Sequence, residues 1–136
     1  MTALSVCSLA SQACRRLAPA CAIAALAGSA TADGIVDIIW DANARFERSV
    51  QVAPGKLTEI CGKLPAGQAV RWEFAATAAV DFNVHYHVAK DVVYPTRLFA
   101  INEAKDTLDT RIEQDYCWMW SNKGAAPATV RLKLQR

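Results

Sequence analysis

The amino-acid sequence predicts an all-β protein: an antiparallel β-sandwich with one intradomain disulfide, preceded by a signal peptide. Three observations predict this fold class. From residue 34 on, apolar residues recur mainly at every second position, which is the period of a half-buried strand. Turn residues interrupt these runs about every ten residues, as in sandwiches rather than βαβ chains. The same region contains two cysteines, Cys61 and Cys117, that are far apart in the sequence. A disulfide between them would tie the first half of the domain to a late strand.

The first 32 residues have the organisation of a secretory signal peptide. Arg15 and Arg16 precede an apolar, alanine-rich run over residues 17–26, and residues 30–32 supply the small side chains that a signal peptidase needs. The run is too short for a membrane span, although a retained N-terminal anchor is the alternative. We expect cleavage after Ala32, a domain over residues 33–136 with no membrane span, and a periplasmic or secreted location.

Removal of this segment changes the charge of the chain. The full sequence has 15 Lys and Arg against 13 Asp and Glu, and both charged residues of the first 32 are arginines. The remaining domain is therefore formally neutral. A protein that binds nucleic acid needs a concentrated basic face, so we expect no nucleic-acid partner.

The cysteine count changes in the same way. Cys7, Cys14 and Cys21 leave with the signal, and Cys61 and Cys117 remain. In an oxidising compartment two remaining cysteines are expected to form a disulfide. The alternative is a free or metal-binding thiol, although no second cluster of soft ligands at zinc spacing accompanies them.

The strand candidates follow the alternation along the chain, and turn residues end them. A Pro-Gly turn follows the second candidate, residues 76–79 form a short link, and Lys90 and Asp91 form a turn. We expect Pro95 to end one short run and residues 102–106 to form a charged turn between two weaker candidates. A helix over residues 100–112 is disfavoured because it lacks a clean apolar stripe. The ten candidates are residues 35–40, 46–52, 57–61, 69–75, 80–88, 92–94, 98–101, 108–112, 116–120 and 129–134.

Several motifs resemble the GOLD domain of p24/emp24-type secretory-pathway proteins. They are Glu-Ile-Cys at residues 59–61, a leucine and glycine turn at Leu64 and Gly67, Val-Asp-Phe-Asn-Val at residues 80–84, and Tyr-Cys-Trp-Met-Trp-Ser-Asn at residues 116–122. Asp115 departs from the family, which favours glycine there. The similarity covers about residues 57–134 and implies a β-sandwich that binds proteins or ligands, without enzymatic activity. It would be a soluble bacterial version that lacks the coiled coil and membrane anchor of the family.

His85 and His87 are the only histidines in the sequence. Residues two apart on a strand leave the same face, so we expect both imidazoles to stand side by side in solvent. Neutral imidazole suits copper, nickel or zinc, and the thioether of Met119 would suit Cu(I). The alternative is that the two histidines are ordinary polar neighbours on a strand surface.

Three aromatic residues are candidates for a binding patch. Trp40, Tyr94 and Trp120 would provide exposed apolar area for a protein partner. For Trp118, Met119 and Trp120, however, packing around the disulfide is the simpler interpretation.

No catalytic arrangement is recognisable. Ser49 and Ser121 lie in no nucleophile motif, and the sequence has no phosphate-binding glycine loop or dinucleotide fingerprint. The sequence therefore predicts an exported, non-enzymatic module without a cofactor that binds a protein or small ligand. A periplasmic protein that binds copper or zinc through the His-x-His pair is the competing hypothesis.

Overall fold

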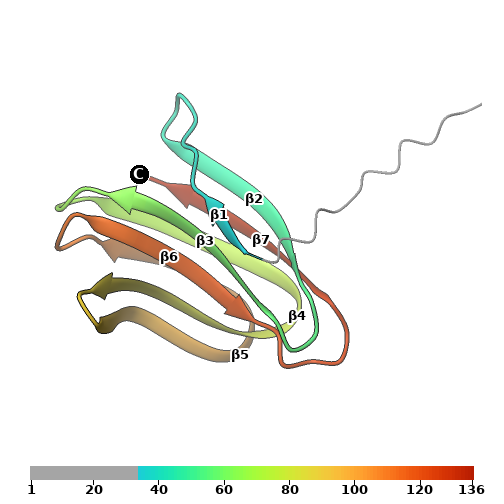
Figure 1. The fold of residues 1–136 in the computed structure, drawn as a ribbon. Helices are drawn as coiled ribbons and strands as arrows, with labels where there is room; N and C mark the ends of the chain where they lie inside the picture. The colour runs from blue at the N-terminus through green and yellow to red at the C-terminus, as the bar shows by residue number, and fades with distance from the viewer. Residues whose placement is uncertain (1–33) are drawn as a thin grey trace, which may run out of the picture.

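The computed structural model describes residues 34–136 (Figure 1). The expected signal peptide, residues 1–32, lies outside the described residues. Within residues 34–136 there is no helix, and hence none long and apolar enough to cross a membrane. The strands are β1 (Ile35–Asp37), β2 (Arg45–Val52), β3 (Leu57–Leu64), β4 (Ala69–Val88), β5 (Asp91–Asp109), β6 (Gln114–Ser121) and β7 (Ala128–Gln135).

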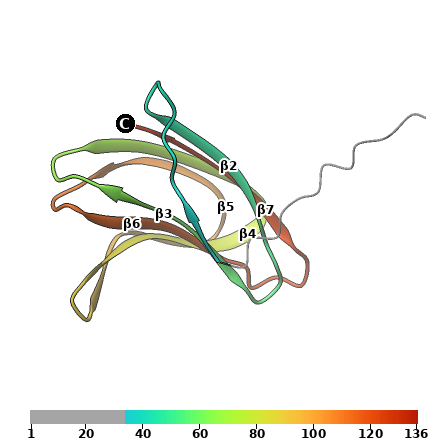
Figure 2. The ribbon, with the colours of Figure 1, turned by 45° about the horizontal axis from the view of Figure 1, so that its top comes forward.

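These strands form one sheet that curls around a common interior (Figures 1 and 2). The hydrogen-bonded order is β1-β3-β6-β4-β7-β2, with β5 pairing only with β4. All pairs are antiparallel except β1 with β3. The all-β prediction is confirmed, but the strands belong to one continuous curled sheet, whereas the sequence analysis expected a sandwich of two sheets.

Strand β4 joins the two halves of the curled sheet. Its residues 71–76 pair with β7, and its residues 81–86 pair with β6. The change of partner occurs where the register against β5 shifts, between Ala75 and Val80. The expected link at residues 76–79 is therefore an irregular part of a strand. Such irregularities bend a strand and increase its twist, which allows β4 to serve both halves.

Strand β5 is also longer than the sequence predicts. Neither Pro95 nor the charged residues 102–106 interrupts it. Because β5 has only β4 beside it, it is an edge strand, where proline and charge are tolerated. Pro95 lies at a register shift, since Val84 pairs with Thr96 and Tyr86 pairs with Val93. The missing amide hydrogen of the proline therefore falls outside a regular ladder.

The core fills the interior of the curl. It is built from alternate residues of both halves, and four aromatic rings from β4 and β6 meet at its centre. Phe82 has ring centroids 4.6 Å from Phe74, 5.1 Å from Trp72 and 5.5 Å from Trp120. Trp118 is also fully buried. Residues on the opposite parity of the same strands therefore point outward, and the candidate site lies among them.

Candidate functional site

Three neighbouring strands place six polar or sulfur-bearing side chains in two rows on the outer side of the sheet. The register between β3, β6 and β4 aligns one residue from each strand in each row. We call this surface the cysteine face; its rows are Cys61, Cys117 and His85, and Glu59, Met119 and Asn83.

The first row contains the predicted disulfide, which the structure confirms. Cys61 and Cys117 are directly paired across β3 and β6, with an S–S distance of 2.14 Å and a Cα–Cα distance of 4.1 Å. Each cysteine is 8% exposed. The bond ties the two strands together on the side of the sheet opposite the core tryptophans.

His85 lies beside the disulfide and is buried, with 5% of its surface exposed. The expectation that it stands in solvent is therefore wrong, although its outward direction is as predicted. Its ring is covered by neighbours on the same face, with centroids 5.8 Å from Tyr94 and 5.3 Å from His87. Alternation along a strand predicts which face a side chain leaves. It does not predict whether larger side chains on the same face cover it.

The protonation of His85 follows from its surroundings. Its Nδ1 lies 2.8 Å from Oδ1 of Asn83, and because an amide oxygen only accepts, Nδ1 carries the proton and Nε2 keeps a lone pair. Burial lowers the pKa of His85. The negative charge of Glu59 partly offsets this effect by raising the pKa, and His87 lowers it further. The imidazole is therefore held neutral with Nε2 as a ligand atom, the form that binds metals.

One group of potential metal ligands combines three strands of this face. Among residues 34–136, ligand atoms of Glu59, His85 and Cys117 lie within 4.8 Å of one another. An oxygen of Glu59 also lies 3.9 Å from Sγ of Cys61. With Cys117 in the disulfide, its sulfur is not a thiolate, so the oxidised chain offers His85 and Glu59 here. Glu59 was not among the predicted ligands, because only the pairing of β3 with β6 and of β6 with β4 places it near His85.

The other predicted ligands lie close to this group. His87 is exposed, shares the outward direction of His85 and meets its ring edge-on. Met119 is partly buried and lies between Glu59 and Asn83 in the second row. The structure therefore brings His85, His87 and Met119 onto one face.

Of the predicted binding aromatics, only Tyr94 is well exposed, at 41%. Trp120 has no exposed surface, so its expected role in a surface patch is wrong; it alternates with Met119 and therefore faces the core. Trp40 is half-buried against the core, with the Arg136 guanidinium 4.6 Å from its ring centroid.

Tyr94 belongs to an apolar cluster that the sequence analysis did not identify. We call it the hairpin patch; it consists of Val88 (42% exposed), Val92 (38%), Val93 (37%) and Tyr94 (41%). Val92 pairs with His87 and Val93 with Tyr86, so these two valines lie on opposite faces of the hairpin. These residues lie at the end of the β4–β5 hairpin, which projects from the body in Figure 2. The guanidinium of Arg97 lies 3.8 Å from the centroid of Tyr94.

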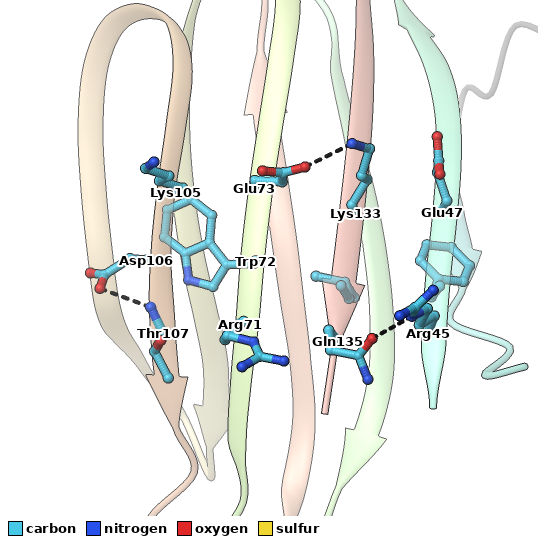
Figure 3. A pocket seen from close by; sticks show the side chains of 12 residues that line it. Arg45, Glu47, Arg71, Trp72, Glu73, Lys105, Asp106, Thr107, Lys133 and Gln135 are labelled. Atoms are coloured by element: carbon cyan, nitrogen blue, oxygen red, sulfur yellow. Dashed lines mark hydrogen bonds and ion pairs between the residues drawn. The ribbon is translucent and has the colours of Figure 1, made fainter. Parts of the chain in front are cut away.

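A shallow groove lies on the other half of the sheet, over β2, β7, β4 and β5 (Figure 3). It has a volume of about 660 Å³ and is lined by charged side chains of both signs. Lys133 and Glu73 form an ion pair of 2.8 Å, and Nε of Arg45 donates to Gln135 over 2.7 Å.

No protein-family model matches the chain, and no curated protein matches it in sequence. Solved structures share its fold. PliG of Aeromonas hydrophila, a periplasmic inhibitor of g-type lysozyme, gives a TM-score of 0.54 at 11% identity, over 75% of this chain and 96% of PliG. PliG of Salmonella Typhimurium gives 0.52 at 10% identity over the same shares. The Yersinia pseudotuberculosis-derived mitogen gives 0.53 at 11% identity, over 67% of this chain and 84% of the mitogen. None of the three is a GOLD domain, so that resemblance stays a prediction.

Proposed function

We propose that this chain is an exported, non-enzymatic binding module that contacts a protein partner through the hairpin patch. The observation that carries the proposal is the exposure of four large apolar side chains, each between 37% and 42%, at one end of the molecule. Large apolar side chains exposed on both faces of one hairpin end provide area that a partner enclosing the hairpin would bury.

The position of the patch favours a macromolecular partner. The last pair of β4 with β6 is Tyr86 with Tyr116, whereas β4 continues to pair with β5 as far as Val88 and Asp91. Beyond Tyr86 the hairpin end, with Val88 and Val92, is therefore a two-stranded ribbon outside the body of the sheet, and Val93 and Tyr94 lie at its base. Such a ribbon can insert into a depression of a partner. Tyr94 and the adjacent Arg97 are residue types that often dominate binding energy at protein interfaces.

Three features support export. The sequence of residues 1–32 has the order of a signal peptide, and Cys61 and Cys117 form a disulfide, which persists in oxidising compartments. The two PliG proteins that share the fold are described as periplasmic.

The arrangement around the buried imidazole supports a non-enzymatic role. A base that activates a nucleophile contacts a hydroxyl or thiol, and the ring neighbours of His85 on this face are Tyr94 and His87. The sulfur next to it in the same row is bonded to Cys61 and is not a nucleophilic thiolate.

Site-specific cross-linking tests the proposal. A photoreactive amino acid replaces Val92 in the hairpin patch or, as the control, Ile39, which is 79% exposed and lies outside the patch. We expect one protein of the exported fraction to be captured from position 92 and not from position 39. Because PliG has this fold, purified g-type lysozyme is the first defined partner to test, by inhibition of its activity.

The captured protein is then purified and its dissociation constant is measured. Val92→Lys is expected to weaken binding by about tenfold or more, as for a buried interface residue, and Ile39→Lys by less than about twofold. Equal capture from both positions, or equal affinity of the two variants, would contradict the role of the hairpin patch.

Metal binding by the oxidised chain is the second candidate function. The close approach of the His85 and His87 rings, at 5.3 Å, favours it, with Glu59 or Met119 as further ligands for copper or zinc. Added Cu²⁺ or Zn²⁺ would then raise the melting temperature of the oxidised protein, because an ion that binds only the folded state stabilises it. Substitution of both histidines by alanine would remove the rise, and a wild-type protein that shows no rise would retire this function.

A further inference from the structure

We propose that reduction of the Cys61–Cys117 disulfide creates a site for one thiophilic divalent cation such as Zn²⁺, bound by both thiolates, His85 and Glu59. The site differs from the His85–His87 pair of the oxidised chain because it requires free thiols and not His87. No ligand of the site belongs to the hairpin patch, although Tyr94 of that patch packs beside His85.

The distances between three of the proposed ligand atoms are close to those found around a single zinc ion. Zinc binds thiolate sulfur at about 2.3 Å and imidazole nitrogen or carboxylate oxygen at about 2.0–2.2 Å in tetrahedral geometry. Ligand atoms around one zinc ion therefore lie roughly 3.3–3.8 Å apart. The ligand atoms of Glu59, His85 and Cys117 lie within 4.8 Å of one another. Side-chain rotations that move these atoms by roughly 1 Å would bring them to the spacing found around one zinc ion.

The sheet supplies the fourth ligand. Cys61 is directly opposite Cys117, with a Cα–Cα distance of 4.1 Å, and its sulfur is 3.9 Å from the carboxylate of Glu59. Once the S–S bond is broken, both sulfurs remain on the same side of the sheet, because neighbouring paired strands hold their Cα atoms. Cys61 lies outside the group of ligand atoms within 4.8 Å of one another, so its side chain has to turn toward His85 after reduction to complete a site with two sulfur, one nitrogen and one oxygen ligand.

The surroundings of His85 fit a metal ligand. Asn83 accepts a hydrogen bond from Nδ1 over 2.8 Å, which directs the Nε2 lone pair away from that bond. Metal-bound histidines characteristically donate their second nitrogen to an oxygen in this way. His85, Cys61 and Cys117 are each at most 8% exposed, so a bound ion would be largely shielded from water, as in structural zinc sites.

A dithiol can reduce the Cys61–Cys117 disulfide by thiol–disulfide exchange. The dithiol transfers two electrons and two protons to the Cys61–Cys117 bond, which yields two thiols, and is itself oxidised to a disulfide. Zn²⁺ then replaces the two thiol protons, which are released to solvent. The ion would restore the link between β3 and β6 that the broken bond provided.

Cobalt substitution tests the site directly. Residues 33–136 are reduced with a phosphine, freed of reductant and titrated with Co²⁺ without oxygen. We expect one equivalent to produce the near-ultraviolet absorption of a thiolate-to-cobalt transition, and Zn²⁺ to abolish it by displacement. The oxidised protein and the Cys61→Ser/Cys117→Ser variant should not show this absorption.

Substitutions then separate the ligands from their neighbours. His85→Gln and Glu59→Gln are each expected to weaken Zn²⁺ binding to the reduced chain by about tenfold or more, since loss even of a supporting residue costs that much. The matched control His87→Gln should change the affinity by less than about twofold. Equal effects of the two histidine substitutions, or binding without the thiolate absorption, would overturn the proposal.

Folding of the reduced chain is measured in parallel by far-ultraviolet circular dichroism. If the reduced chain stays folded, Zn²⁺ should raise its melting temperature; if it unfolds, Zn²⁺ should restore the strand signal, because the ligands come from three strands. A reduced chain that Zn²⁺ neither stabilises nor refolds would refute the site. Binding by the oxidised chain that depends on His87 would instead support the second candidate function.

Discussion

Removal of the Cys61–Cys117 disulfide is expected to lower the free energy of unfolding by about 4 kcal/mol. The two cysteines are 56 residues apart, and closing a loop of that length removes about 14 cal/mol/K of entropy from the unfolded chain, or about 4 kcal/mol at 25 °C. A domain of roughly 100 residues has an unfolding entropy near 0.2 kcal/mol/K. The melting temperature should therefore fall by roughly 20 °C.

The test compares the oxidised protein with the Cys61→Ala/Cys117→Ala variant, by thermal melting and by urea unfolding followed through tryptophan fluorescence. The matched control is Lys63→Ala/Asp115→Ala, the next outward pair on the same two strands. Both control residues are exposed, and exposed charges contribute less than about 1 kcal/mol. A cysteine variant that melts within about 5 °C of the wild type, or together with the control, would refute the reasoning from loop closure.

Three further predictions concern the core, a loop and the buried histidine. Trp118→Ala, at a fully buried position, is expected to cost about 3–5 kcal/mol in urea unfolding, against less than about 1.5 kcal/mol for its partly exposed neighbour Met119→Ala. Asn122→Ala removes three hydrogen bonds to backbone groups and should cost about 2–4 kcal/mol, whereas the exposed Asn102→Ala should cost little. Burial lowers the pKa of His85 from 6.5, so below about pH 6.5 the unfolded chain binds more protons than the folded one and stability falls as the pH falls. His85→Gln should therefore reduce the loss of melting temperature between about pH 7.5 and pH 5.

The interior could be predicted from the sequence because strict alternation has a single physical cause. Val70, Trp72 and Phe74 on β4 are buried, and the charged residues between them are exposed, as their spacing indicates. The disulfide could also be predicted from the sequence, because in an oxidising compartment each of two cysteines has only the other as a partner. These parts of the fold depend on local pattern and chemistry.

The long hairpin of β4 and β5 could not be predicted, because its strands break the local rules where the sheet bends. Residues 76–79 lack alternation since β4 changes its partner there, from β7 to β6. Proline and a charged segment ordinarily end a strand, but β5 has a neighbour on one side only and so retains its pairing. Whether a strand lies at an edge is a property of the whole sheet, which a single segment does not encode.

The candidate site depends on the same irregularity of the edge strand. Opposite His85, the register of β5 slips between Thr96, which faces Val84, and Val93, which faces Tyr86. Tyr94 lies in this slipped segment, with its ring beside the imidazole, and so helps to bury a histidine that would otherwise be an exposed neighbour of the disulfide. Burial keeps His85 neutral, and its hydrogen bond to Asn83 sets the tautomer. The irregular pairing that made the hairpin unpredictable therefore also buries His85 in its neutral form, and it places Tyr94, the only well-exposed aromatic residue of the predicted trio, at the hairpin patch.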